Sequence, residues 1–128
     1  MEPERPGGRE KKMMYSTTLP RSLKDSLEKA VDSLHRRKAD WVRASLNLFL
    51  ELSEKEQENL ILDAYKKMET SHLRPFTTTL TEGQLAGLQK VSKKIKRTKA
   101  DIVRTAIFTL MSRNASDQEK EIKKTLSR

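Results

Sequence analysis

The chain has 128 residues, of which 34% are hydrophobic, 5% aromatic and 35% charged. This length suits one compact domain with a thin core, because a domain usually spans about 100–200 residues. The absence of cysteine excludes disulfides and thiolate metal sites and fits a reducing cytosol. The sequence has neither an apolar N-terminal run nor about 18 consecutive apolar residues, so we expect neither export nor a membrane span.

The formal net charge of +9 is concentrated in two regions. Residues 11–50 carry 9 basic and 4 acidic side chains, a net of +5, and residues 73–113 carry 9 and 2, a net of +7. Two basic regions provide the positive field that a polyanion-binding protein requires. The alternative is a solvated basic surface that has no partner.

The chain begins with a polar arm and a short strand. Residues 1–11 combine proline and glycine with charged residues, so we predict a disordered N-terminal arm. Residues 15–19 are β-branched, aromatic or small, and the strand that they predict has Tyr15 and Leu19 on one face. Pro20 ends this strand and suits the first turn of a helix.

Two helices are predicted after Pro20. Apolar residues recur at steps of three and four from Leu23 to Leu34, which indicates an amphipathic helix. A second helix begins near Lys38 and has an inward stripe of Val42, Leu46 and Phe49, flanked by Trp41. Together with the strand, these helices form the predicted first unit, residues 12–52.

Residues 53–74 form a predicted link that is itself helical. Ser53 to Glu56 has the pattern of a capping box, and apolar residues follow it at helical spacing up to Met68. We predict a helix over residues 54–69 that ends before Pro75.

The second unit, residues 75–113, repeats the first, and in its second helix Val103, Ile107 and Leu110 form the predicted inward stripe, flanked by Ile102. Residues 15–50 align with residues 76–111 at a constant offset of 61 without a gap, and 11 of the 36 aligned positions are identical. A period near 60 is too long for a solenoid unit of about 20–50 residues. The sequence therefore predicts a duplicated module whose halves pair within one chain.

The second unit differs from the first in its helix caps. Thr81, with Glu82 or Gln84, is expected to cap its first helix, and Thr98 with Asp101 forms a capping-box pattern for its second. Arg37 occupies the Thr98 position in the first unit, so we predict a weaker cap there. In the tail, residues 114–128, a further helix capped by Ser116 is predicted.

The repeated unit resembles the ribbon-helix-helix superfamily of bacterial DNA-binding proteins, of the Arc and MetJ type. The resemblance rests on the strand that closes on leucine, on Pro20 at the strand–helix junction, and on the sequence Lys-Ala-Asp-x-Val-Arg that begins at Lys38 and again at Lys99. It implies a mainly α-helical fold with one short two-stranded antiparallel β-ribbon. Because the unit occurs twice, the resemblance implies a tandem version, an intramolecular pseudo-dimer.

The family resemblance further implies that the ribbon enters the major groove of double-stranded DNA. Strand alternation places one set of side chains toward the DNA, and we expect base contacts from Met14, Ser16, Thr18, Thr77 and Thr79. Pro75 also faces outward, but it departs from the polar residue usual in the family. The alternative is that these serines and threonines are strand formers on a solvated face.

Phosphate contacts are expected at the N-termini of the two helices that begin with Lys38 and Lys99, where backbone amides and the helix dipole favour anions. The amides of residues 38–40 and 99–101 are the predicted donors. Asp40 and Asp101 are expected to cap these helices, and Arg43 and Arg104 are weaker candidates for phosphate. The expected phosphate-contacting residues are Lys11, Lys12, Arg37, Lys38, Ala39, Arg74, Thr98, Lys99 and Ala100.

Three functional classes remain open. We expect a transcriptional regulator, usually a repressor in this family, that binds an imperfect inverted repeat, and the sequence leaves open whether chains associate side by side on longer DNA. The first alternative is an accessory factor of a conjugative relaxosome of the TraY type, with a relaxase or another protein bound through the tail. The second is an antitoxin-like interaction module.

An enzyme is not expected. His35 and His72 lie far apart in sequence without a nearby carboxylate or nucleophile, so the sequence indicates no catalytic residue. We likewise expect no metal, no cofactor and no membrane partner. The predicted location is the bacterial cytoplasm, with the nucleoid or a plasmid.

Overall fold

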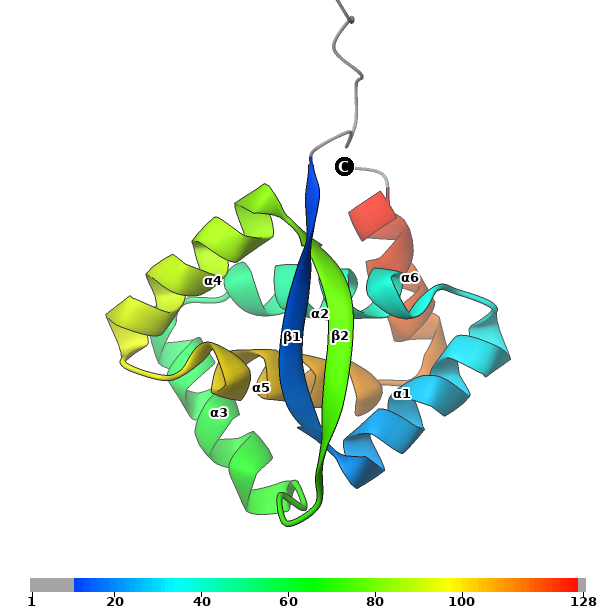
Figure 1. The fold of residues 1–128 in the computed structure, drawn as a ribbon, viewed down its shortest axis with the longest axis horizontal. Coiled ribbons are helices and arrows are strands. Elements are labelled where there is room, and N and C mark those ends of the chain that lie inside the picture. The colour runs from blue at the N-terminus through cyan, green and yellow to red at the C-terminus, as the bar shows by residue number, and fades with distance from the viewer. Residues whose placement is uncertain (1–10, 127–128) are drawn as a thin grey trace, which may run out of the picture.

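The computed structural model describes residues 11–126 (Figure 1). The described part is mainly helical with one two-stranded antiparallel sheet, as predicted, while the predicted arm lies outside it apart from Lys11. No helix within residues 11–126 is both long and apolar enough to cross a membrane. The elements in chain order are β1 (Lys12–Pro20), α1 (Arg21–Leu34), α2 (Lys38–Leu50), α3 (Glu54–Lys67), β2 (Leu73–Thr81), α4 (Glu82–Ile95), α5 (Lys99–Met111) and α6 (Ala115–Leu126).

Each element of the first half has an equivalent that begins 61 residues later in the chain. The bounds of β2, α4 and α5 equal those of β1, α1 and α2 shifted by 61, and α6 begins 61 residues after α3. The helix predicted over residues 54–69 is α3, which ends at Lys67. The structural repeat therefore contains a third helix beyond the 36 residues that align most clearly in sequence.

The two strands pair symmetrically about their centre. Ser16 lies opposite Thr77, which is its own equivalent at the offset of 61, so equivalent positions on either side of this pair are exchanged. Each strand has nine residues rather than the five predicted. The apolar pattern marks only the central part, because backbone pairing extends beyond the side chains that the helices cover.

The ends of the ribbon are held by a matched pair of backbone hydrogen bonds. The amide of Arg21 donates to the carbonyl of His72 at 2.7 Å, and the amide of Glu82 donates to the carbonyl of Lys11 at 3.1 Å. Each bond joins the first residue of a helix to the residue that precedes the opposite strand. The start of α1 is therefore fixed to β2, and the start of α4 to β1.

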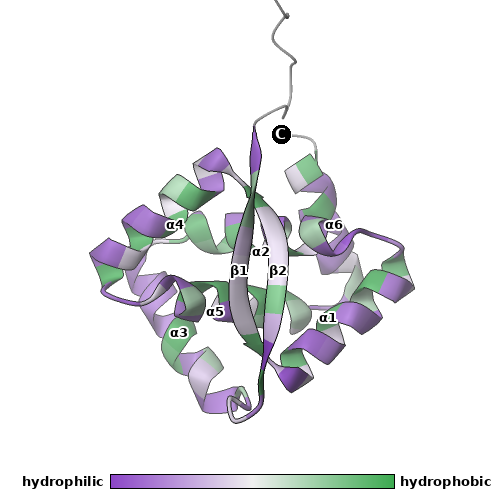
Figure 2. Ribbon diagram, in the orientation of Figure 1, coloured by the Kyte–Doolittle hydropathy of each residue, from purple (hydrophilic) through white to green (hydrophobic). Residues whose placement is uncertain are grey.

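The helices form a layer behind the ribbon. In Figure 1, α2 and α5 cross behind the strands in opposite directions, α1 and α4 lie on opposite sides, and α3 and α6 occupy the remaining corners. Figure 2 shows hydrophobic residues on α2 and α5 and many hydrophilic ones on α1, α3 and α4. The predicted inward stripes are buried and consist of Val42, Leu46, Phe49, Val103, Ile107 and Leu110.

Trp41 and Ile102, which we predicted to flank these stripes, are both 0% exposed. The reason is that α3 and α6 cover a second side of α5 and α2, and they contribute the fully buried Ile61 and Ile122. α2 and α5 are therefore enclosed on more than one face. Burying them in this way gives a core that 36-residue units with two helices would not provide.

Each third helix is attached to the end of the preceding one by a buried glutamine. The side-chain amide of Gln57 donates to the carbonyl of Phe49 at 3.1 Å, and that of Gln118 donates to the carbonyl of Leu110 at 3.0 Å. These carbonyls lie in the last turns of α2 and α5, and each also accepts a backbone amide, that of Leu52 or of Arg113, at 3.1 Å. The glutamines add a second donor to each carbonyl and attach α3 and α6 to the helix ends.

The helix caps agree with the predictions in part. The capping boxes of Ser53 with Glu56 and of Thr81 with Gln84 are confirmed, and Arg37 makes no side-chain cap, as predicted. The predicted Ser116 cap is wrong. The Asn114 side chain accepts from the amide of Asp117 at 2.8 Å, because Asn114 occupies the position equivalent to Ser53.

α1 and α4 end in the left-handed backbone conformation. His35 has a φ of 54° and Lys96 a φ of 59°, and the two residues are equivalent at the offset of 61. This conformation allows the sharp turn into α2 and α5, and it is the one for which glycine is usually used. Both halves therefore carry the same local strain at this turn.

Candidate nucleic-acid interface

The outer face of the ribbon carries the residues for which base contacts were predicted. Met14 is 76% exposed, and Ser16, Pro75 and Thr77 are also exposed. Thr18 and Thr79 belong to the same alternating set but are half-buried. The opposite face packs on the helices through Leu19, Phe76, Thr78 and Leu80, with Tyr15 and Thr17 half-buried.

The centre of this face is a small polar pair. The hydroxyl oxygens of Ser16 and Thr77 lie 3.1 Å apart and share one hydrogen bond, and both residues are exposed. Each hydroxyl keeps further hydrogen-bonding capacity toward solvent. The pair thus presents short donors and acceptors at the point where the two strands exchange equivalent positions.

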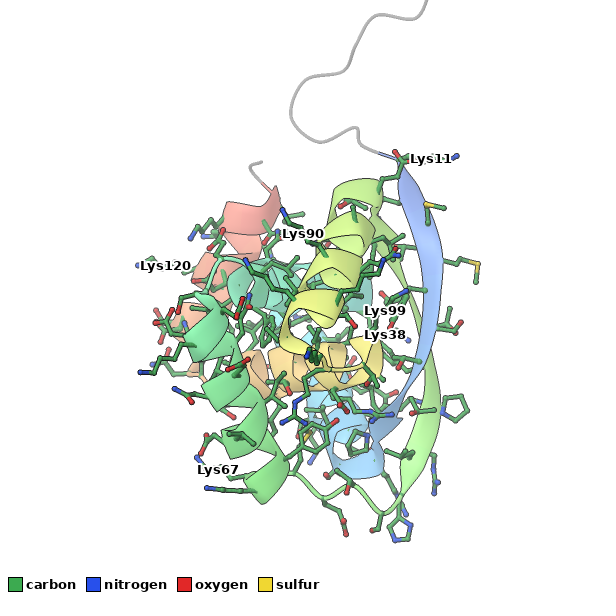
Figure 3. All side chains as sticks on the ribbon, turned by 90° about the vertical axis from the view of Figure 1, so that its left-hand side faces the viewer. Lys11, Lys38, Lys67, Lys90, Lys99 and Lys120 are labelled. Carbon is green, nitrogen blue, oxygen red and sulfur yellow. The ribbon has the colours of Figure 1, made fainter. Side chains whose placement is uncertain are left out.

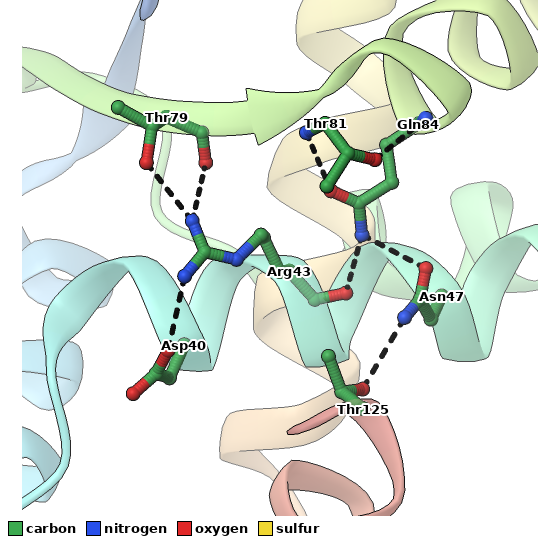
Figure 4. Close-up of polar contacts among 7 residues, drawn as sticks. All are labelled: Asp40, Arg43, Asn47, Thr79, Thr81, Gln84 and Thr125. Atoms are coloured by element: carbon green, nitrogen blue, oxygen red, sulfur yellow. Dashed lines mark hydrogen bonds and ion pairs between the residues drawn. The ribbon is translucent and has the colours of Figure 1, made fainter. Parts of the chain in front are cut away.

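Arg43 of α2 supports the ribbon from below. Its Nη1 donates to the hydroxyl of Thr79 at 2.9 Å and to the Thr79 carbonyl at 3.3 Å, while Nη2 donates to Asp40 at 3.0 Å (Figure 4). Asp40 and Arg43 are only 8% and 9% exposed. The guanidinium therefore joins a buried carboxylate of the first half to a strand of the second half.

Arg104 of α5 makes the equivalent contact in the other half. Its Nε donates to the carbonyl of Thr18 at 2.9 Å, and its Nη2 donates to the Thr18 hydroxyl. Asp101 is 3.9 Å from its Nη1, because the hydroxyl of Tyr65 lies between them and donates to Asp101 at 2.8 Å. Burial raises the pKa of Tyr65 above its usual value, so the phenol keeps this proton at neutral pH.

These contacts correct several predictions. Asp101 does not complete a capping box with Thr98, since its carboxylate accepts from Tyr65, and Asp40 pairs with Arg43 rather than capping α2. Arg43 and Arg104 were weak candidates for phosphate, and their guanidinium groups bind ribbon backbone and carboxylates instead. The i, i+3 spacing of Asp and Arg in both motifs was the available signal for these pairs.

The N-termini of α2 and α5 lie beside the ribbon with backbone amides still free. The amide of Asp40 donates to the carbonyl of Arg37, and that of Asp101 to the hydroxyl of Thr98, so these two are not available as predicted. No hydrogen bond within residues 11–126 uses the amides of residues 38–39 and 99–100. They lie at the positive ends of the two helix dipoles.

Basic side chains surround the ribbon on the same side. Figure 3 shows Lys38 and Lys99 close to the strands and Lys11 at one end of them, whereas Lys67 and Lys120 lie on the opposite side of the molecule. Lys38 also lies against the ring of Phe76, with its Nζ 5.1 Å from the ring centroid. The other predicted phosphate contacts that are exposed are Lys12, Arg37, Arg74 and Thr98, and Ala39 and Ala100 are half-buried.

The sequence predictions missed a polar contact between α4 and α2. The side-chain amide of Gln84 donates to the carbonyl of Arg43 at 3.0 Å and to the side-chain oxygen of Asn47 at 2.8 Å (Figure 4). Asn47 in turn donates to the hydroxyl of Thr125 on α6 at 3.3 Å. Gln84 occupies the position of the apolar Leu23, which was the only sequence signal for it.

The geometry therefore brings one exposed ribbon face, two free helix N-termini and several lysines to one side of the molecule. No protein-family model matches the chain, and no curated protein or solved structure shows a significant similarity to it. Within residues 11–126, no group of three or more histidines and acidic residues is placed to hold a metal ion.

Proposed function

We propose that this chain is a sequence-specific double-stranded DNA-binding protein of the ribbon-helix-helix type. The observation that carries the proposal is the ribbon register, in which Ser16 faces its own equivalent Thr77 on an exposed strand face. A two-stranded ribbon fits the major groove, where short hydroxyl side chains reach base edges. The twofold character of such a ribbon matches the inverted repeats that dimeric proteins of this kind bind.

In this proposal the two halves act as a dimer within one chain. The matched bounds of the strands and of the first two helices in each half, together with the exchange of equivalent positions in the ribbon, support it. A covalent link makes pairing intramolecular, at an effective concentration in the millimolar range for a linker of suitable length. Folding should therefore not depend on protein concentration.

The phosphate backbone is held at the starts of α2 and α5. The amides of residues 38–39 and 99–100 lie at the positive ends of the helix dipoles, and Lys38 and Lys99 stand beside them. The two ends are not equal, since Thr98 caps α5 whereas Arg37 makes no cap on α2. The target is therefore an imperfect inverted repeat that is held more firmly under the second half.

The biological role that we propose is transcriptional regulation, as a repressor. An accessory role at a conjugative transfer origin uses the same DNA contacts and differs in its protein partner. Neighbouring genes separate the two roles, since a relaxase gene or a transfer origin beside the coding sequence favours the accessory role. The antitoxin role instead requires a protein partner on the tail and no preferred duplex.

The proposal is tested by selection of random duplexes with the purified chain, followed by binding titrations of the enriched sequence. We expect an imperfect inverted repeat to be enriched and its affinity to fall steeply with rising salt, because bound phosphates release counterions. If no duplex is enriched over competitor DNA at low salt, the chain is not a sequence-specific DNA-binding protein.

Point variants then test the phosphate contacts. Lys99→Ala and Lys38→Ala should weaken binding to cognate and random duplexes alike, and each should reduce the salt slope by about 1. Lys120→Ala is the matched control, since Lys120 is exposed on the side opposite the ribbon (Figure 3). An equal loss from Lys120→Ala would show that net charge alone drives binding.

A further inference from the structure

Two half-buried threonines of the ribbon are held by arginines that come from beneath it. Thr79 and Thr18 are equivalent at the offset of 61, and so are their partners Arg43 and Arg104. In each case the guanidinium donates to both the hydroxyl and the carbonyl of one threonine. Such a two-point contact fixes the backbone and the side chain of the threonine together.

The guanidinium determines the direction of its hydrogen bond with the threonine hydroxyl. A guanidinium has only donors, so the threonine hydroxyl must accept the bond and keeps its own proton for another partner. Figure 4 shows both oxygens of Thr79 turned toward the guanidinium of Arg43. The positive charge of the guanidinium behind the hydroxyl also disfavours a hydrogen-bond donor of the ligand and favours a hydrogen-bond acceptor.

The arginines are themselves held in place. Arg43 pairs with the buried Asp40 at 3.0 Å, and Arg104 is positioned by Asp101 and by Tyr65, whose hydroxyl lies 3.4 Å from its Nη1. These partners fix the guanidinium before any ligand binds, so the threonine rotamer is not selected at the moment of binding. Preorganisation of this kind lowers the entropic cost of recognition.

On this basis we propose that Arg43 and Arg104 are positioning residues that turn Thr79 and Thr18 into hydrogen-bond donors for base reading. The inference rests on the proposed DNA-binding function. In the major groove the matching acceptors are purine N7, guanine O6 and thymine O4, while the amino groups of adenine and cytosine are donors and are rejected. The ribbon therefore selects the acceptor edge of a base at each threonine.

The two threonines lie at symmetric positions in the ribbon. Thr79 pairs with Met14 and Thr18 with Pro75, so each threonine lies two residues from the central pair of Ser16 and Thr77. Four residues of strand span about 14 Å, and base pairs are stacked about 3.4 Å apart. The base pairs that the two threonines contact are therefore about four base-pair steps apart. The same acceptor preference is expected on both sides of the centre.

The test uses the duplex that the full chain selects, with 7-deazapurines placed one at a time to remove a single N7 acceptor. We expect one position in each half-site to lose about fivefold to tenfold in affinity for the unmodified chain. Thr79→Val should show the same loss on the natural duplex and no further loss on the modified one. Thr79→Ser, which keeps the hydroxyl, should bind like the unmodified chain.

The role of the arginine is tested by combining variants. Arg43→Met should lose the same affinity as Thr79→Val on the cognate duplex, and the double variant should lose no more, because the arginine acts through the threonine. Thr77→Val is the matched control, since its hydroxyl bonds to Ser16 and its effect should add to that of Arg43→Met. If Arg43→Met unfolds the chain, Arg104→Met with Thr18→Val makes the same comparison in the other half.

The outcomes separate the two proposals. Enrichment of a duplex together with equal affinity for all deazapurine positions and for guanine O6 or thymine O4 replacements would overturn the donor assignment alone. Equal weakening of cognate and random DNA by Arg43→Met would show that the arginine acts only through charge and would overturn the positioning role. Failure to enrich any duplex would overturn this inference together with the DNA-binding function.

Discussion

The two halves of the molecule contain the same Asp-Arg-Thr contact but support it differently. In the first half Arg43 is bonded directly to Asp40 at 3.0 Å, whereas in the second half Arg104 is 3.9 Å from Asp101 and Tyr65 bridges them. Tyr65 belongs to α3, and its equivalent in α6 is the exposed Leu126. The helix that connects the halves thus also supports the ribbon, on one side only.

A second difference lies where the first helix of each half packs on the opposite half. Gln84 of α4 bonds to Asn47 of α2, but the equivalent positions on the other side are Leu23 and Phe108, which line one small cavity. Both partners have changed together, so each contact remains matched in polarity. The comparison teaches that the halves keep their fold through paired changes and are free to differ as interfaces.

The largest effect on stability in this comparison is expected when each arginine is replaced. Arg43→Met should lower the free energy of unfolding by about 3 kcal/mol, because it leaves the buried Asp40 without a partner. Arg104→Met should cost only about 1 kcal/mol, since Asp101 keeps its bond from Tyr65. Urea denaturation of both variants measures the difference, and equal losses would show that Tyr65 does not compensate.

The polar contact between α4 and α2 gives the next effect. Gln84→Leu should cost about 2 kcal/mol, because the Asn47 amide oxygen loses its donor, the Arg43 carbonyl loses its second donor and the Thr81 cap loses its partner. The double variant Gln84→Leu with Asn47→Phe recreates the apolar pair of the other side. It should recover at least about 1 kcal/mol by urea denaturation, and strictly additive losses would contradict the pairing.

A smaller effect is expected at Thr105, which is 0% exposed and whose hydroxyl has no hydrogen-bond partner among residues 11–126. The equivalent residue of the first half is the apolar Ala44. Thr105→Val keeps the shape and removes the unpaired hydroxyl, so it should stabilise the fold by about 1 kcal/mol. A calorimetric melting temperature that falls would show that this hydroxyl has a partner in solution.

The smallest effect concerns the matched turns that end α1 and α4. Replacing His35 or Lys96 with glycine should stabilise the fold by about 0.5 kcal/mol each, since the relief of left-handed strain exceeds the entropy cost of glycine. Because the two turns are equivalent, the gains should be alike and additive. Thermal melts of the single and double variants check this, and a gain at one turn alone would show that the strain is unequal.

The fold follows from the sequence wherever a local pattern determines it. The inward stripe of Val42, Leu46 and Phe49, the capping box at Ser53 and the ribbon alternation all depend on spacing within one element. The burial of Trp41 did not follow, because it depends on α6 packing against α2 from far along the chain.

The candidate site could be predicted less completely. Which residues alternate outward on the ribbon is a local property, so the exposure of Met14 and Ser16 could be predicted from sequence. The engagement of Thr18 and Thr79 by arginines joins residues 86 and 36 positions apart, and no local pattern encodes it. The role of Tyr65 likewise requires the three-dimensional arrangement of α3 and α5.

The most direct test of the central claim is a titration of methyl-labelled methionines by NMR with the selected duplex. Met14 is 76% exposed on the outer ribbon face, whereas Met68 is 9% exposed and lies at the end of α3. If the ribbon enters the major groove, the Met14 methyl resonance should shift at one equivalent of DNA and that of Met68 should remain unchanged. Saturable DNA binding with an unchanged Met14 resonance would contradict the account.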